Sequence, residues 1–294
     1  MGDAKLIHVA PIDRKSADAA VKRWHYSGKV VNNSQLHLGA FLNGELLGAM
    51  QFGPSLDKRK IQGLVEGTPW NGFVELNRMA FSDRLPRNAE SRCIAVAMRM
   101  LRTHAPHVQW VVSFADGAQC GDGTIYRASG FVLTGLRRNN SLWAAPAEPG
   151  STPEVFSRTS LTDGSSRQQQ QRAGDIARRV FSRTPLTKAD CPRKHAEASR
   201  AVGAGDLAMS NGGASMRAFK AAGFTPIDGF QLRYMFFIDP TARERLTVPV
   251  LSFSAIDAAG ARMYRGEKMT RAVSSARDGA PVAAGGATPT TALR

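Results

Sequence analysis

The chain has 294 residues, 43% of them hydrophobic and 21% charged, which is enough apolar material for one or two globular domains. Its net charge of +15 is the unusual number, and the excess lies in both halves of the chain. A protein this basic typically meets a polyanion, first of all nucleic acid, although a merely solvated basic surface is the alternative. No run is apolar enough for a membrane span, and three cysteines without a CxxC pair suit a reducing cytoplasm.

The N-terminal residues predict a strand followed by a helix. Residues 6–12 have strand composition, and Asp13 or Ser16 is placed to cap the helix that follows. Ala17, Ala20, Val21 and Trp24 recur on one face of that helix, which should end near Ser27-Gly28.

The clearest local pattern is a hairpin. Residues 36–42 and 45–53 are strand-like and flank Asn43-Gly44. A type I′ turn prefers this dipeptide because both of its central residues need positive φ. The pattern therefore predicts two antiparallel strands.

The central segment, residues 75–131, reads as strand, polar loop, helix, strand, short helix and strand. The run FVELNRMAF is strand-like, and Ile94, Ala97, Met98 and Leu101 recur at helical spacing before Pro106. Residues 110–114 form a short apolar run typical of a buried strand.

Two strands joined by such a helix should be parallel, with a right-handed crossover. Ligands collect beyond the carboxyl ends of parallel strands, which is where the loop 82–91 and Asp116 fall. We therefore expect the site at this edge of the sheet.

The later part of the chain is less regular. A strand is predicted after Phe131, and a further helix over 212–226 and a strand over 229–240 follow a segment rich in Ser, Gly, Gln and Arg. The related phrases at 155–163 and 180–190 suggest a small duplication. The predicted organisation is a core of residues 1–146, a basic low-complexity insertion of 147–208, a segment of 209–266 completing the core and a disordered tail of 267–294.

This order of elements resembles the GNAT acyltransferase fold, a mixed α/β (α+β) architecture with a hairpin and a parallel strand pair. The phrases KRWHYSG, NSQLHLGAFLNGELLGAMQFGP, GTPWNGFVELNRMAFSD, RNAESR and WVVSFADG…CGDGTIYRASGFVLTG are similar to the Mom-type DNA-modification proteins of bacteriophages. The resemblance covers most of residues 20–137 and, less densely, 210–265. It implies transfer of a methylcarbamoyl-type group to N6 of adenine in double-stranded DNA, which shields phage DNA from restriction in the host cytoplasm.

The loop before the central helix departs from the wider superfamily. GNAT enzymes hold the coenzyme A pyrophosphate with a glycine-rich loop, whereas this position reads RLPRNAESR. Arg87, Asn88 and Ser91, with the helix N-terminus, are the candidates for holding an anion there. A Ser or Asn helix cap with Glu90 in the first turn is the alternative for Asn88 and Ser91. The sequence does not determine the identity of the cofactor, for which acyl-CoA and a metal such as iron are the two alternatives.

Three residues are candidates for chemistry at the sheet edge. Asp116 suits a general base or an adenine-reading acceptor, the alternative being a turn before Gly117. Arg78 suits stabilisation of developing charge, the alternative being a pair with Glu75. The resemblance implies that Tyr126 is a general acid near the acyl carrier, and a core tyrosine is the alternative. With the adenine substrate that the resemblance implies, we expect Arg78, Asp116 and Tyr126 in one pocket wide enough for a purine.

The remaining candidates belong to the first helix and to the basic surface. His25 and Tyr26 suit a base or metal ligand and a stacking wall, the alternative being a helix-end contact. His104 and His107 have no third ligand in sight, which argues against a metal there. The residues predicted to contact DNA phosphates are Arg92, Arg99, Arg102, Arg137, Arg138 and the arginines of the insertion.

Two rival functions are open on the sequence. An acyl-CoA-dependent N-acetyltransferase acting on a protein or small amine should bind acetyl-CoA, which the missing glycine loop argues against. A basic DNA-binding protein that blocks restriction by occupancy should bind DNA in a salt-sensitive way and alter no base.

Overall fold

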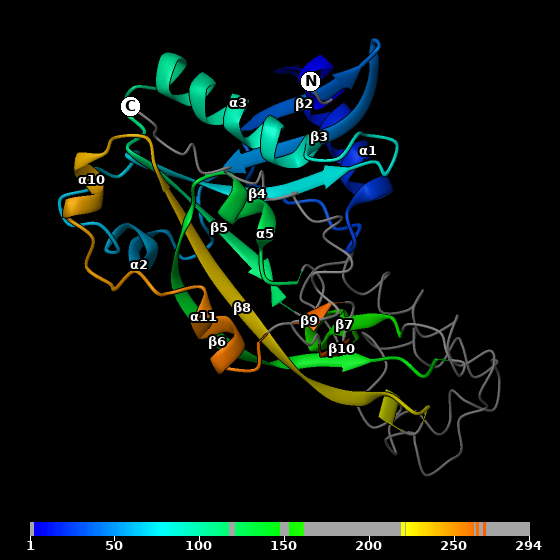
Figure 1. Cartoon of the computed structure of the whole chain (residues 1–294). Helices are drawn as coiled ribbons and strands as arrows, with labels where there is room; N and C mark the ends of the chain where they lie inside the picture. The colour runs from blue at the N-terminus through cyan, green and yellow to red at the C-terminus, as the bar shows by residue number, and fades with distance from the viewer. Residues whose placement is uncertain are drawn as a thin grey trace, which may run out of the picture.

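A single mixed sheet organises the computed structural model, which describes residues 3–117, 121–147, 153–161, 219–220, 222–261, 263–264 and 267–268. The sheet has eight strands in the order β1-β2-β3-β4-β5-β8-β6-β7 (Figure 1). Its strands are β1 (His8–Pro11), β2 (Leu36–Leu42), β3 (Glu45–Gly53), β4 (Phe73–Phe81), β5 (Trp110–Asp116), β6 (Val132–Ala144), β7 (Val155–Ser157) and β8 (Thr225–Phe237). The mixed α/β fold with a hairpin and one parallel pair is confirmed.

The predicted N-terminal strand and helix are confirmed, but the helix ends at Trp24 rather than near Ser27-Gly28, because His25 is already extended, with φ −79° and ψ 131°. β1 is preceded by a short 3-10 helix, η1 (Asp3–Leu6). Helix α1 spans Arg14–Trp24, and Asp13 caps it by accepting a 2.9 Å hydrogen bond from the Ser16 amide. β2 and β3 pair around Asn43 and Gly44, whose φ values of 53° and 80° are those of a type I′ turn.

The crossover between β4 and β5 is made by α3 (Ala89–His104), and the two strands are parallel. The predicted inner face of this helix, Ile94, Ala97, Met98 and Leu101, is buried against the sheet. Both strands are described over their full lengths, but only Phe73–Glu75 of β4 pairs with Trp110–Val112 of β5. The two strands therefore diverge toward their carboxyl ends.

Strand β8 lies between β5 and β6 and is antiparallel to both. It begins at Thr225 rather than 229 because β6 continues to Ala144 and pairs with Thr225–Ile227. It ends at Phe237 because the amides of Ile238 and Asp239 bond to the Gln109 carbonyl instead. Beyond the end of β5, β6 and β8 continue as a long ribbon (Figure 1).

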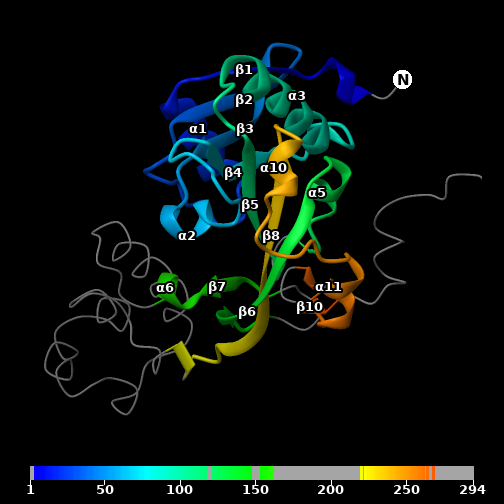
Figure 2. The same cartoon turned by 90° about the vertical axis from the view of Figure 1, so that its left-hand side faces the viewer.

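Helices cover both faces of the sheet. Figure 2 shows α1 and α2 (Lys58–Gln62) on one side and α3, α5 (Thr124–Ala128) and α11 (Ser254–Ala258) on the other. We call these the α1 face and the α3 face. The largest core lies on the α3 face, and smaller clusters lie under α1 and α2 on the other.

The remaining elements are α6 (Arg158–Leu161), α10 (Thr241–Glu244) and the pair β9 (Met263–Tyr264) and β10 (Glu267–Lys268). Glu267 and Lys268, where the disordered tail was predicted to begin, thus belong to a strand. The rest of that tail, most of the insertion 147–208, the phrase at 180–190 and most of the helix at 212–226 lie outside the described residues. No helix in the described part of the chain is long and apolar enough to cross a membrane.

Candidate active site on the α1 face

A β-bulge in β4 builds the site. Gln51 pairs with Arg78 and Phe52 with Leu76, so Asn77 is an extra residue without a partner in the β3 register. Strand residues normally alternate between faces, and Glu75 and Arg78 would then point to opposite sides. Because Asn77 is an extra residue, the alternation shifts by one, and the side chains of Glu75 and Arg78 both point to the α1 face, where Gln51 also lies.

The bulge is packed tightly against Gly53 of β3. A Cβ on Gly53 would lie 2.5 Å from the Asn33 carbonyl oxygen and 2.8 Å from Asn77 Oδ1. We expect Gly53→Ala to lower the free energy of unfolding by about 1–3 kcal/mol, because backbone atoms would have to move. Urea denaturation measures this, with Gly63→Ala as control, because its Cβ would meet nothing closer than 3.7 Å. Equal midpoints for the two variants would contradict it.

Arg78 holds the loop that follows α1. Its Nε donates a 2.8 Å hydrogen bond to the Lys29 carbonyl, and its Nη1 donates a 2.6 Å bond to the Asn77 carbonyl. Among the described residues it forms no ion pair, so the alternative of a pair with Glu75 is not what the structure shows. Burial lowers its pKa, and Tyr26 and Glu75 act in the opposite direction. Because the carbonyls are neutral, they do not cancel the charge of Arg78. The guanidinium can therefore still attract an anionic group of a substrate.

Glu75 lies beside Arg78 on the same face. Ser55 donates its hydroxyl to the Glu75 carboxylate. Burial raises the pKa of Glu75, while hydrogen bonds from Ser55 and Asn77 and the charge of Arg78 lower it less. Glu75 was expected only as a pairing partner of Arg78, because the bulge that turns it toward the α1 face leaves no clear pattern in the residues.

His25 and Tyr26 meet Arg78 at the end of α1. The two rings lie 4.3 Å apart between centroids at 30°, and Tyr26 is 55% exposed. His25 Nδ1 accepts a 3.1 Å hydrogen bond from the Ser27 amide, which leaves the ring proton on Nε2 in the neutral form. Burial, with a smaller effect of Arg78, lowers the pKa of His25 to about 3. The ring is thus a neutral donor and a stacking surface, and its Nδ1 is already occupied.

The depressed pKa of His25 predicts an acid-sensitive fold. The unfolded chain binds a proton near pH 6.5, whereas the folded chain resists protonation of this ring until about pH 3. Unfolding is therefore increasingly favoured as pH falls from about 6.5 toward 3. We expect His25→Gln to lose less stability than the wild type over this window in urea denaturation at a series of pH values. Parallel pH profiles would contradict the assignment.

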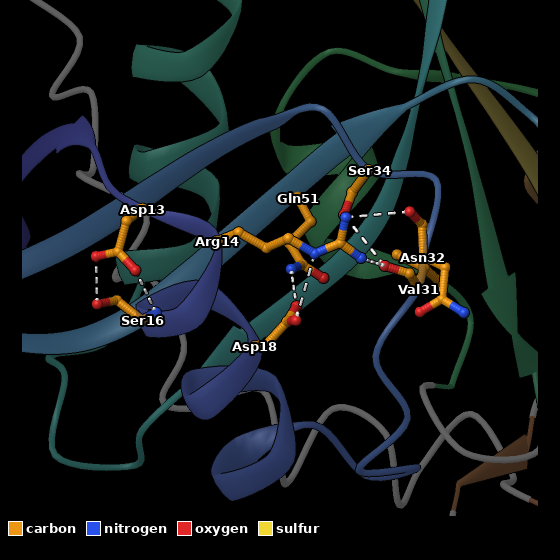
Figure 3. Close-up of polar contacts among 8 residues, drawn as sticks. All are labelled: Asp13, Arg14, Ser16, Asp18, Val31, Asn32, Ser34 and Gln51. Atoms are coloured by element: carbon orange, nitrogen blue, oxygen red, sulfur yellow. Dashed lines mark hydrogen bonds and ion pairs between the residues drawn. The ribbon is translucent and has the colours of Figure 1, made fainter. Parts of the chain in front are cut away.

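Figure 3 shows the polar contacts that hold Val31 and Asn32, in the loop after α1. Arg14 of α1 donates to the carbonyls of Asn32 and Val31 at 3.1 Å each, and it lies 3.6 Å from Asp18. Asp18 in turn accepts a 2.8 Å bond from Gln51, the cross-strand partner of Arg78. The loop is thus held by α1 at one end and by Arg78 at the other.

Asp116 lies at the end of β5 on the α1 face. Val112 and Trp110 pack in the cluster under α2, and strand alternation places Asp116 on their side. Its directly opposed partner is Gln231 of β8. Asp116 thus shares a face with Arg78 and Glu75, as expected for residues at the carboxyl ends of neighbouring parallel strands.

Tyr126 lies on the other side of the sheet. Its buried ring stacks on Tyr234 at 5.0 Å and packs in the core with α3, and its hydroxyl accepts a 2.8 Å bond from Ser113. Ser113 also lies 3.2 Å from the Leu76 carbonyl, at the point where β4 and β5 diverge. The expectation that Tyr126 shares a pocket with Arg78 and Asp116 is not met in this geometry, because the sheet separates the ring from Arg78.

The loop before α3 carries Arg87, Asn88 and Ser91. Asn88 adopts the left-handed conformation, with φ 66° and ψ 15°, and its side chain does not cap the helix. This is the conformation that glycine adopts most easily. Ser91 donates to the Asn88 carbonyl at 3.2 Å, and Arg87 is exposed. Whether the loop holds an anion stays a prediction.

The basic residues predicted for DNA contact do not share one surface. Arg99 and Arg102 are exposed on α3, whereas Arg92 is half-buried and its Nε has no partner among the described residues. Arg137 and Arg138 are exposed neighbours on β6 and point to opposite faces. His104 and His107 are both exposed, and no group of three metal-ligating His, Cys, Asp or Glu residues occurs among the residues described.

The sequence of the chain is similar to a known protein family and to a phage protein. Residues 6–181 match the model of the Mom protein family. Over 133 residues, or 45% of this chain, it is 41% identical to the methylcarbamoylase Mom of Escherichia phage Mu, and the match spans 55% of that relative. The chain thus aligns with about half the length of that protein.

Solved structures resemble the chain only distantly. A Bacillus subtilis acetyltransferase in complex with CoA is 11% identical, with a TM-score of 0.32 over 44% of this chain and 78% of that one. A GNAT-family acetyltransferase from Streptococcus pneumoniae is 14% identical, with a TM-score of 0.33 over 51% and 95%. Likeness at this level says nothing of cofactor or substrate. The family model, in contrast, spans more than half of the sequence, and the chain belongs to the Mom protein family.

Proposed function

We propose that the protein is a transferase that attaches a methylcarbamoyl-type group to N6 of adenine in duplex DNA. The observation that carries the proposal is the α1 face, which bears the neutral His25 after α1, the half-buried Arg78 at the bulge of β4 and Asp116 at the end of β5. Family membership, the methylcarbamoylase name of the phage Mu relative and the net charge of +15 support it.

The chemistry requires a base, a cation and a stacking surface. The amino nitrogen of adenine is a weak nucleophile, and inside a duplex it can be reached only after the base leaves the stack. Asp116 takes a proton from N6 as the bond from N6 to the transferred carbon forms, and the leaving group departs from the donor. Arg78 stabilises the negative charge that develops. The exposed Tyr26 ring, backed by His25, stacks on the purine.

We further propose separate roles for the loop before α3 and for Tyr126. Arg87, Asn88 and Ser91 bind an anionic group of the donor at the start of α3. Tyr126 positions β5 where it separates from β4, through Ser113 and the Leu76 carbonyl. In a host bacterium the modified adenine would shield phage DNA from restriction.

Nucleoside mass spectrometry tests the function. DNA from bacteria expressing the folded chain should yield a deoxyadenosine derivative heavier by the transferred group, absent from cells that carry an empty vector. Only unmodified deoxyadenosine, with the folded protein present, would contradict the proposal. Acetyl-CoA-dependent acetylation of a protein or amine, again with unmodified DNA, would favour the N-acetyltransferase alternative.

A further inference from the structure

A row of polar side chains crosses the sheet beside Asp116. Asp116 of β5 and Arg137 of β6 both pair with Gln231 of β8, one from each side. Directly opposed residues on neighbouring strands point to the same face, so all three lie on the α1 face. Two strand spacings of about 4.8 Å separate Asp116 from Arg137.

Arg233 adds a second cation to this row. It follows Gln231 by two residues in β8, faces the same side and is opposed by Gly135, which has no side chain. Its guanidinium lies over Gly135, since a Cβ there would be 3.2 Å from three of its atoms. Nε and Nη2 donate to Thr134 at 3.0 and 2.6 Å. The cation is thereby fixed in place before any ligand arrives.

Arg137 and Arg233 have no ion-pair partner in the part of the chain that the structure describes. The ion pairs among those described residues are Arg14–Asp18, Arg84–Glu45 and Arg127–Asp122. Arg233 is half-buried, and burial together with the nearby charge of Arg137 lowers its pKa. Arg137 and Arg233 are diagonal neighbours on adjacent strands, where like charges repel each other, and an anion bound between them would relieve that repulsion.

We propose that Arg137 and Arg233 bind one backbone phosphate of the DNA, next to the adenine that Asp116 receives. The inference rests on the proposed function for its ligand, and on the register of β5, β8 and β6 for its geometry. Guanidinium groups suit phosphate oxygens, and such contacts fix the register of the duplex without reading its sequence. Gln231 lies between Arg137 and Asp116, and it would face the sugar that links the bound phosphate to the adenine.

The test is the salt dependence of duplex DNA binding, measured by fluorescence anisotropy with the full chain. We expect Arg137→Gln to lower affinity about tenfold and to reduce the slope of log affinity against log salt by about 1. Arg233→Gln should do the same, and the double variant should reduce the slope no further because both arginines hold one phosphate. Arg84→Gln, whose arginine is paired with Glu45, is the control of equal charge change and should leave the slope unchanged.

A second measurement separates binding from folding. Arg137 is exposed, and its removal relieves repulsion, so Arg137→Gln should melt at the same temperature as the wild type or higher in low salt. An Arg137→Gln slope equal to that of Arg84→Gln, or a loss of coenzyme A binding with DNA binding unchanged, would overturn the inference. Weakened DNA binding by the variants in a chain that modifies no adenine would instead uphold the phosphate site and contradict the proposed function alone.

Discussion

Arg78→Gln is expected to reduce adenine modification by about 100-fold or more, the usual effect of removing a preorganised group that stabilises developing charge. Arg78 is half-buried, and its contacts with the Lys29 and Asn77 carbonyls hold it in one orientation. Glutamine removes the positive charge while keeping a polar side chain. The measurement is the fraction of modified deoxyadenosine in DNA from cells that express each variant at equal level.

Two further variants sharpen this test. Arg78→Lys keeps the charge but not the planar geometry that reaches two carbonyls, and it should recover only part of the activity. Arg84→Gln makes the same change in net charge at an exposed, paired arginine and should modify DNA as the wild type does. Wild-type activity in folded Arg78→Gln would remove Arg78 from the chemistry.

Asp116→Asn should lower modification by roughly 10²–10⁴-fold, the range for loss of a general base. Asparagine matches the carboxylate in shape and keeps an acceptor, but it cannot take the N6 proton. Asp116 lies at the end of β5 rather than within the core, so the change should leave the melting temperature close to that of the wild type. The same nucleoside assay, together with thermal unfolding, measures both.

Tyr126→Phe is the matched comparison on the opposite face. Its hydroxyl accepts a bond from Ser113 within the core, and we expect a loss of modification below about tenfold with some loss of stability. A loss as large as that of Asp116→Asn in a stable protein would show that Tyr126 takes part in proton transfer. Wild-type activity in Asp116→Asn would exclude Asp116 as the base.

Local patterns in the sequence were sufficient for much of the framework. The Asn43-Gly44 turn, the Asp13 cap and the parallel pair around α3 depend on residues close together in the chain, and each is confirmed. The position of β8 was not accessible in this way. It enters between β5 and β6 from almost a hundred residues further on, so nothing local linked Arg233 to Arg137.

The site was predicted less completely than the fold because side-chain direction depends on register. One extra residue at Asn77 turns Glu75 and Arg78 to the same face, and strand composition does not reveal a bulge. Asp116 was expected at the strand end and lies there, next to Gln231. Tyr126 is only ten residues after Asp116, yet it lies on the α3 face, because its helix α5 packs against α3.

A crystal structure of the chain with a short DNA duplex would test most directly whether one side of this sheet holds the reaction. We predict an adenine turned out of the duplex, with its amino nitrogen near Asp116, Arg78 beside it and a phosphate between Arg137 and Arg233. DNA seated over α3, with Asp116 and Arg78 remote from any base, would contradict the account.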